Sequence, residues 1–322
     1  MDEFELIERF FAAPAHIRND VSIGIGDDGA VTQPDPGAEL VVATDMIVEG
    51  THFPAGTPAH ALGHRCLAVN LSDLAAMGAK PAWCTLAISL PTGSSDWVRE
   101  FAAGFMQLAA QHDVALIGGD TVRGPLSMTV TVHGQIPAGT AIRRDGAGPD
   151  QSIYVTGQPG AAAAGLALLQ ARVEPVDLNH ELVRGFYYPE PRVVEGLGLR
   201  GIATAMIDVS DGLHVDLKHL LSASGLGAML DVGKIRPAPT TVEQFGVGRA
   251  LEFALTGGDD YELCFTVPAA REQALRDVAG DWDCDIHHLG RTRAESNIEW
   301  RWHGADYTVP QATFSHFSES AT

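Results

Sequence analysis

Lysine is almost absent from this sequence. Only Lys80, Lys218 and Lys234 occur among 322 residues, and none lies in the G-x-x-x-x-G-K-[ST] pattern of a phosphate-binding loop. Any nucleotide must therefore be bound by metal, backbone glycines or arginine. The formal net charge of −20 also argues against nucleic acid as a partner, because a strongly acidic chain repels the phosphate backbone.

Cysteine and membrane-spanning runs are scarce as well. Cys66, Cys84, Cys264 and Cys284 are far apart and have no zinc-type spacing. No apolar run of about 18 residues could cross a membrane, and the segment Met1–Glu5 is acidic where a secretion signal is basic. The 13 histidines form no H-E-x-x-H pattern. We expect a cytoplasmic protein with reduced thiols and no membrane partner.

The pattern of apolar residues predicts two domains built from helices and sheets, a size that suits 322 residues. The first half shows helices near 57–77 and 96–112 between strands near 40–44, 82–90, 114–117 and 126–136. The strand at 126–136 alternates in polarity, which is typical of antiparallel pairing. We predict an α/β fold with α+β layers rather than a doubly wound sheet. The predicted domains are 1–145 and 150–322, with the linker at 143–149.

Aspartate recurs where apolar stretches end and where glycines form turns. The set is Asp27, Asp28, Asp45, Asp120, Asp208, Asp211, Asp259 and Asp260, with Asp73 on an apolar helix. Carboxylates at the ends of neighbouring strands would meet at one sheet edge and repel one another unless cations lay among them. Oxygen ligands favour hard ions, and Mg²⁺ is usually held by a few carboxylates and substrate phosphates. The pattern predicts a phosphoryl-transfer site with several Mg²⁺ ions, and the alternative is that aspartate and glycine simply favour turns.

The loop Gly24–Ala30 fits the dinucleotide fingerprint G-x-G-x-x-G. Asp27 and Asp28 would face the pyrophosphate there, so we favour a turn that presents carboxylates to a metal. An acidic surface turn is the alternative. We expect Asp28 to be the ligand and leave Asp27 as a second ligand or turn former. Asp73, on a helix predicted to be buried, must be neutralised, paired or bound to metal.

Ordered motifs along nearly the whole chain resemble the thiamine-monophosphate kinase family. They are Gly24–Asp28, Thr44–Asp45, Gly50–Phe53, Ala68–Ala79, Leu116–Thr121, Tyr154–Gly157, Asp208–Leu213 and Gly257–Leu263. The resemblance implies the fold of the aminoimidazole-ribonucleotide-synthetase superfamily. Its N-terminal domain has a mixed or antiparallel sheet that pairs with its twin in a homodimer, its C-terminal domain is α+β, and ATP and Mg²⁺ lie between the domains. The implied reaction transfers phosphate directly, in line, from ATP to thiamine monophosphate, which is the last step of thiamine diphosphate biosynthesis.

The resemblance also implies roles for individual residues. Metal-binding positions are Asp28, Ala43, Thr44, Asp45, Asp73, Asp120, Asp208 and Asp211. Nucleotide-binding positions are Gly119, Asp120, Arg144 and Ser210. Contacts to thiamine phosphate are His52, Glu262 and Phe314. We expect Asp45, Asp120 and Asp211 to be catalytic, because together with Mg²⁺ they would cancel charge in the transition state; no general base is needed, because the acceptor is already a phosphate anion.

Three positions depart from the family's pattern. Ala43 stands where serine is common, so a metal contact there must use the backbone carbonyl. Asp259 replaces a glutamate, which shortens its reach. Phe314 replaces tryptophan or tyrosine, which keeps a flat ring and loses the polar group.

Two rival enzymes share the superfamily. A selenophosphate synthetase would need a reactive cysteine or its equivalent with a lysine near the N-terminus, and residues 1–26 contain neither. A hydrogenase-maturation relative would need a C-terminal cysteine, whereas the chain ends Ser320-Ala321-Thr322. A sensor of nucleotide or Mg²⁺ without catalysis is the alternative of a different class, and the complete acidic set argues against it.

Overall fold

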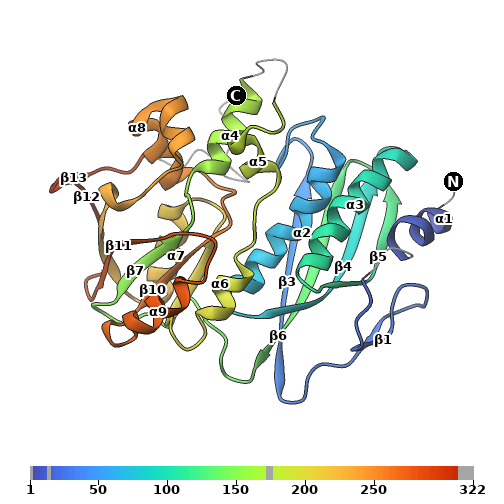
Figure 1. Cartoon of the computed structure of the whole chain (residues 1–322), viewed down its shortest axis with the longest axis horizontal. Coiled ribbons are helices and arrows are strands. Elements are labelled where there is room, and N and C mark those ends of the chain that lie inside the picture. Colours follow the sequence, from blue (N-terminus) through green and yellow to red (C-terminus); the bar gives the residue numbers. More distant parts are fainter. Residues whose placement is uncertain (1–2, 13–15, 172–176, 311–322) are drawn as a thin grey trace. The chain divides into compact units, whose positions relative to one another are not determined.

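The computed structural model describes residues 3–12, 16–171 and 177–310. The chain divides into two compact units, Met1–Ala141 and Ile142–Thr322 (Figure 1). No helix in these described ranges is both long enough and apolar enough to cross a membrane. Phe314 lies outside the described residues.

The first unit is built on a four-stranded mixed sheet. The strands run in the order β3 (Ala38–Val48), β6 (Ser127–Pro137), β4 (Lys80–Leu90) and β5 (Ala115–Arg123). Only β4 and β5 are parallel, and the other neighbours are antiparallel. The remaining elements are α1 (Glu3–Ile7), a π-helical turn (Glu8–Ala12), β1 (Val21–Ile23), β2 (Val31–Thr32), α2 (Ala59–Ala76) and α3 (Ser95–Gln111).

The two long helices, α2 and α3, cover one face of this sheet (Figure 1). Helix α2 is buried almost all round, as an apolar helix between a sheet and another helix must be. The other face carries Leu40, Val42 and Met46 of β3 with exposed fractions of 46%, 56% and 53%. Because alternate residues of a strand share a face, these three side chains form one exposed apolar row.

The second unit is built on a seven-stranded sheet. The strands run in the order β13 (Ala305–Tyr307), β12 (Ile298–Trp302), β9 (Gly227–Asp231), β11 (Ile286–Arg293), β7 (Ser152–Thr156), β10 (Glu262–Val267) and β8 (Ala205–Val209). All neighbours are antiparallel except β9 and β12. Its helices are α4 (Ala161–Gln170), α5 (Glu181–Tyr187), α6 (Val193–Gly198), α7 (Leu213–Ala223), α8 (Pro239–Thr256) and α9 (Glu272–Ala279).

The predicted α/β fold with α+β layers is confirmed, but two aspartates do not lie where strands end. Strand β3 continues to Val48, so Asp45 lies inside it and is paired with Val130. Gly118, Gly119 and Asp120 do not form a turn either, because β5 continues to Arg123. In both places pairing with the neighbouring strand prevails over the local preference of glycine and aspartate for turns.

Candidate functional site

Asp45 is held in place by a buried asparagine. The side-chain oxygen of Asn70 accepts a 2.8 Å hydrogen bond from the backbone N–H of Asp45, and its Nδ2 donates to the carbonyl of Cys66 at 2.9 Å. Asn70 is fully buried, whereas Asp45 is exposed and Asp73 is half-buried. Asp73 follows Asn70 by three residues, so both side chains share one face of α2. The helix thus presents Asp73 toward β3. Asn70 is a positioning residue, which lies within the Ala68–Ala79 motif but received no role of its own from the sequence.

Ala43 and Thr44 lie just before Asp45 on an edge strand of the sheet. The Asp45 N–H bonds to Asn70 rather than to β6, so this part of β3 presents backbone groups to the open edge. Residues two apart in a strand direct their backbone groups the same way, so the Ala43 carbonyl faces that edge too. The Thr44 side chain lies on the same face of the sheet as Leu40, Val42 and Met46, and its hydroxyl lies 2.9 Å from that of Thr131. Ala43 can therefore serve as a ligand through its backbone, as its lack of a polar side chain requires.

Asp120 and Gly119 lie on β5, at the opposite edge of the same sheet. Gly119 is paired with Leu86 of β4, and a Cβ on Gly119 would lie 1.9 Å from the Leu86 carbonyl oxygen. Only glycine fits there. Asp120 is exposed, and its carboxylate accepts the N–H of Thr121 at 2.9 Å.

The acidic loop between β1 and β2 is exposed. Asp27 accepts the backbone N–H of Asp28 at 2.8 Å, so Asp27 shapes the turn, as one of its two predicted roles requires. Both carboxylates face solvent. No heavy atom would lie within 4 Å of a Cβ at Gly26 or Gly29, so the tip is loosely packed.

His52 is half-buried in the turn that follows β3. Its Nδ1 lies 3.0 Å from the backbone nitrogen of Val48, which donates to it. A neutral imidazole that accepts at Nδ1 carries its proton on Nε2. Any hydrogen bond that the neutral His52 ring donates therefore comes from Nε2.

In the second unit, Ser210 and Asp211 lie in a turn that is shaped by a buried carboxylate. The backbone N–H groups of Ser210, Asp211 and Gly212 all donate to one oxygen of Asp216, at 3.0, 2.9 and 3.1 Å. Burial raises the pKa of Asp216 to about 7, together with the nearby charges of Asp211 and Asp208, while the N–H donors lower it. The motif Asp208–Leu213 did not include Asp216, yet this residue fixes the shape of the turn.

The turn Gly257–Asp260 lies against the Ser210 turn. The N–H of Asp259 donates to the Ser210 carbonyl at 2.8 Å, and the N–H of Tyr261 donates to the Val209 carbonyl at 2.8 Å. This arrangement follows from β10 pairing with β8, which brings the start of one strand beside the end of the other. Asp259 therefore lies next to predicted nucleotide and metal positions, and its role was open at the sequence level.

Asp260, in contrast, has a structural role. Its carboxylate accepts the N–H groups of Gly160 and Ala162, at 2.6 and 3.2 Å, at the start of α4. Burial raises the pKa of Asp260 well above its usual range, and these two N–H groups oppose that rise. The carboxyl group caps the helix rather than reaching toward Asp259.

Glu262 is buried, and both of its carboxylate oxygens accept hydrogen bonds. Both of its oxygens receive hydrogen bonds from Arg192, at 2.7 and 2.8 Å, and one also accepts the hydroxyl of Thr156 at 2.6 Å. The pair lines a cavity of about 650 Å³ with Tyr188 and Trp282, a volume that suits a small molecule. Glu262 thus forms the wall of a candidate substrate pocket, and any ligand contact would share oxygens that Arg192 already holds.

Arg144 is exposed at the start of the second unit. Its carbonyl accepts the hydroxyl of Ser224 at 2.8 Å, which fixes the backbone and leaves the guanidinium toward solvent. The adjacent Arg143 forms an ion pair with Asp145. Of the two arginines, Arg144 is the one whose side chain is suited to clamp a phosphate.

The carboxylates of each unit, taken alone, do not form a ready metal centre. Across residues 3–12, 16–171 and 177–310, no three His, Cys, Asp or Glu side chains are grouped so as to hold a metal ion. The donors nevertheless fit Mg²⁺, because Asp28, Asp45, Asp120 and Asp211 are exposed oxygen ligands. An incomplete ligand set of this kind is what substrate phosphates commonly complete.

The two-unit fold, with aspartates on strands β3 and β5, is that of a known class of protein. Residues 26–136 match the AIR synthase related protein, N-terminal domain, and residues 148–303 match the corresponding C-terminal domain. The thiamine-monophosphate kinase of Salmonella typhimurium is 45% identical over 95% of this chain and 98% of the relative. The chain belongs to the thiamine-monophosphate kinase family.

Solved structures agree with this assignment. The crystal structure of thiamine-monophosphate kinase from Stenotrophomonas maltophilia K279a matches with a TM-score of 0.87 and 45% identity, over 94% of this chain and 97% of that one. AaThiL complexed with AMPPCP and TMP matches with a TM-score of 0.74 and 28% identity, over 86% of this chain and 87% of that one.

Proposed function

We propose that this protein transfers the γ-phosphate of ATP to thiamine monophosphate, directly and in line, in a Mg²⁺-dependent reaction that yields thiamine diphosphate. The observation that carries the proposal is the 45% identity to a thiamine-monophosphate kinase over almost the whole chain. AaThiL, which shares the fold, is described with AMPPCP and TMP bound, the pair of ligands that this reaction requires. We further propose a cytoplasmic location, in which the four unpaired cysteines would remain reduced.

Magnesium would be held by Asp28, Ala43, Thr44, Asp45, Asp73, Asp120, Asp208 and Asp211. When bound, Mg²⁺ neutralises charge on the phosphates that react. The protein's own residues would hold these ligands in position. Asn70 fixes the backbone at Asp45, and Asp216 holds the turn that presents Ser210 and Asp211 to the nucleotide.

Nucleotide and acceptor would be bound by different parts of the chain. Gly119, Asp120, Arg144 and Ser210 would contact ATP, where Arg144 offers a guanidinium fork to phosphate. His52 would donate a hydrogen bond from Nε2 to the acceptor's phosphate, and Glu262 and Phe314 would also contact the acceptor. The acceptor phosphate is already an anion, so these residues need only orient it for attack.

The geometry of the first unit further supports a homodimer. Asp45 and Asp120 lie on opposite edge strands, three strand spacings apart, which is about 14 Å. Two aspartate side chains and two Mg–O bonds of about 2.1 Å together span about 11 Å, so one chain cannot place both on one ion. A second copy whose β5 edge meets the β3 edge would supply the missing carboxylate.

The proposal is tested by incubating the purified protein with ATP and Mg²⁺, with and without thiamine monophosphate, and separating the products by chromatography. We expect thiamine diphosphate and ADP in equal amounts, and ADP release that requires both the acceptor and Mg²⁺. Binding of ATP without turnover would favour the non-catalytic sensor instead, and formation of no thiamine diphosphate would overturn the assignment.

A further inference from the structure

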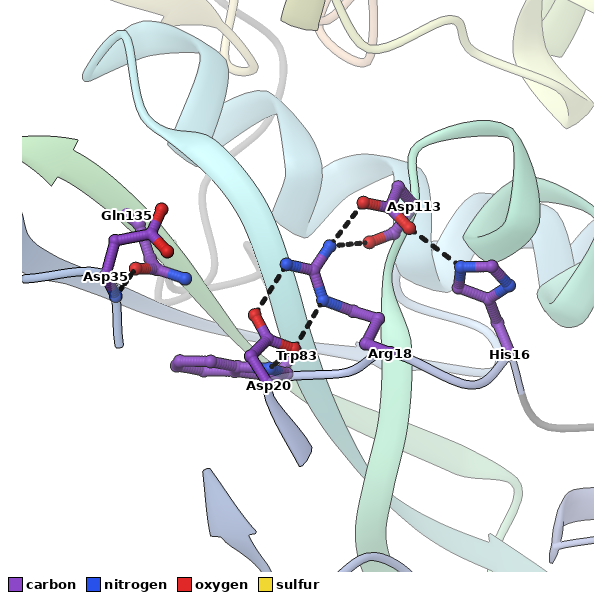
Figure 2. A network of polar contacts seen from close by, with 7 residues as sticks. All are labelled: His16, Arg18, Asp20, Asp35, Trp83, Asp113 and Gln135. Carbon is purple, nitrogen blue, oxygen red and sulfur yellow. Dashed lines mark hydrogen bonds and ion pairs between the residues drawn. The ribbon is translucent and has the colours of Figure 1, made fainter. Parts of the chain in front are cut away.

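The first unit contains a network centred on Arg18, which lies just before the acidic loop (Figure 2). Its guanidinium binds the two oxygens of Asp20, from Nε at 2.9 Å and from Nη2 at 2.6 Å. The remaining nitrogen, Nη1, donates to the side chain and the carbonyl of Asp113, at 2.5 and 2.6 Å. The side chains of Arg18 and Asp20 are only 12% and 18% exposed, so this ion pair is shielded from water better than a surface pair, whereas the Asp113 side chain is 55% exposed.

Asp20 is the base of the hairpin that carries the acidic loop. One of its oxygens also accepts the indole N–H of Trp83 at 3.1 Å, and its carbonyl accepts the N–H of Gln33 at 2.8 Å on the far side of the hairpin. Arg18 lowers the pKa of Asp20, as the indole also does, while partial burial opposes them. Asp20 therefore stays ionised and ties both legs of the hairpin to strand β4.

Asp113 lies just before β5, the strand that carries Asp120. It lies between α3 and β5 in a left-handed conformation, with φ of 55°, and the next residue but one is the first of β5. A single guanidinium therefore joins the segment that leads to Asp28 with the segment that leads to Asp120. The loop tip itself is exposed and loosely packed, so its position depends on how firmly its base is held.

We propose that Arg18 is a positioning residue, which holds the Asp27–Asp28 loop and the Asp120 strand in a fixed relation within the first unit. This inference rests on the proposed function, in which Asp28 and Asp120 bind Mg²⁺. Arg18 itself is not among the proposed metal-binding or substrate-binding residues. Its effect is to reduce the ordering that the loop must undergo when metal binds.

The test uses the full-length variants Arg18→Met and Arg18→Lys. The matched control is Arg99→Met, which removes an exposed arginine of α3 that pairs with Asp96 at 2.7 Å. Hydrogen exchange is measured at the amides of residues 21–33, and Mg²⁺ affinity is measured by calorimetry in the presence of AMPPCP. Turnover with ATP and thiamine monophosphate is recorded as a function of Mg²⁺ concentration.

For Arg18→Met we expect about tenfold faster exchange in residues 21–33, with exchange in β4 and β6 unchanged, because the part-buried charged hydrogen bonds to Asp20 at the base of the hairpin are lost. Mg²⁺ affinity should fall about tenfold, while turnover at saturating Mg²⁺ falls less than about twofold. Arg18→Lys keeps one ion pair and should be intermediate. Arg99→Met should match the wild type.

Unchanged exchange in residues 21–33, or faster exchange throughout the first unit, would overturn the inference. Wild-type Mg²⁺ affinity in Arg18→Met would overturn it as well, and would leave the proposed function standing. A wild-type protein that binds Mg²⁺ with AMPPCP yet makes no thiamine diphosphate would overturn the proposed function. The loss of Mg²⁺ affinity in Arg18→Met would then still support the positioning role.

Discussion

Asp45 and Asp120 lie on the two edge strands of the first unit's sheet, and Gly119, the neighbour of Asp120, is in register with Asp45 across β6 and β4. The two aspartates are therefore close to one line across the sheet but separated by its whole width. This relationship changes how the acidic set is interpreted. Residues that the sequence placed in one cage lie on opposite edges of one sheet, so a single chain does not bring them together within this unit.

The first prediction concerns Asp45→Asn and Asp120→Asn. Each variant removes one negative charge from an exposed position, so the free energy of unfolding should change by less than about 1 kcal/mol. Turnover should fall at least about 100-fold, because the proposed Mg²⁺ that neutralises the reacting phosphates would lose a carboxylate ligand. The measurements are thermal unfolding and ADP release at saturating Mg²⁺. Near-normal activity in either variant would contradict its proposed role as a Mg²⁺ ligand.

The second prediction follows from the proposed homodimer. If Asp45 of one subunit works with Asp120 of the partner subunit, mixing the two inactive variants creates heterodimers with one intact site. Unfolding and refolding an equal mixture should then recover about a quarter of wild-type activity, since half of the dimers regain one of two sites. Each variant refolded alone is the control. No recovery in a mixture that has demonstrably exchanged subunits would show that each site is built from a single chain.

The third prediction concerns the two glycines before Asp120. A Cβ on Gly119 would lie 1.9 Å from the Leu86 carbonyl oxygen, whereas no heavy atom lies within 4 Å of a Cβ on Gly118. Gly119→Ala must push β5 away from β4 and should lower the free energy of unfolding by about 2–3 kcal/mol. Gly118→Ala should change it by less than about 1 kcal/mol. Urea unfolding of both variants checks this, and equal effects would contradict the close approach of the two strands.

The sequence was informative where function depends on local motifs and less so where it depends on pairing across the sheet. The Asp208–Leu213 and Gly257–Leu263 motifs were predicted to lie at strand ends, and the structure brings Ser210 and Asp259 together there. Asp45 and Asp120 were misplaced, because the lengths of β3 and β5 are set by partner strands that are remote in sequence. Asn70, Asp216 and Arg18 contact other site residues rather than a ligand. Contacts of that kind have no characteristic spacing in the sequence, so motifs do not reveal them.

The fourth prediction concerns the buried pair Arg192–Glu262. Arg192→Met would leave the Glu262 carboxylate buried without its two charged donors, and should destabilise the second unit by about 3–5 kcal/mol. Adding Glu262→Gln removes the stranded charge, so the double variant should be more stable than Arg192→Met alone.

The matched control for this pair is Arg143 and Asp145, which are exposed and whose coupling should stay below about 1 kcal/mol. The measurement is a double-mutant cycle on the unfolding transition of the second unit, with KM for thiamine monophosphate recorded for each variant. A coupling between Arg192 and Glu262 no larger than that of the control would mean that the pair is not the support of the pocket wall. A coupling above about 2 kcal/mol, with KM rising only in the variants that break the pair, would show that Arg192 keeps Glu262 in place for the substrate.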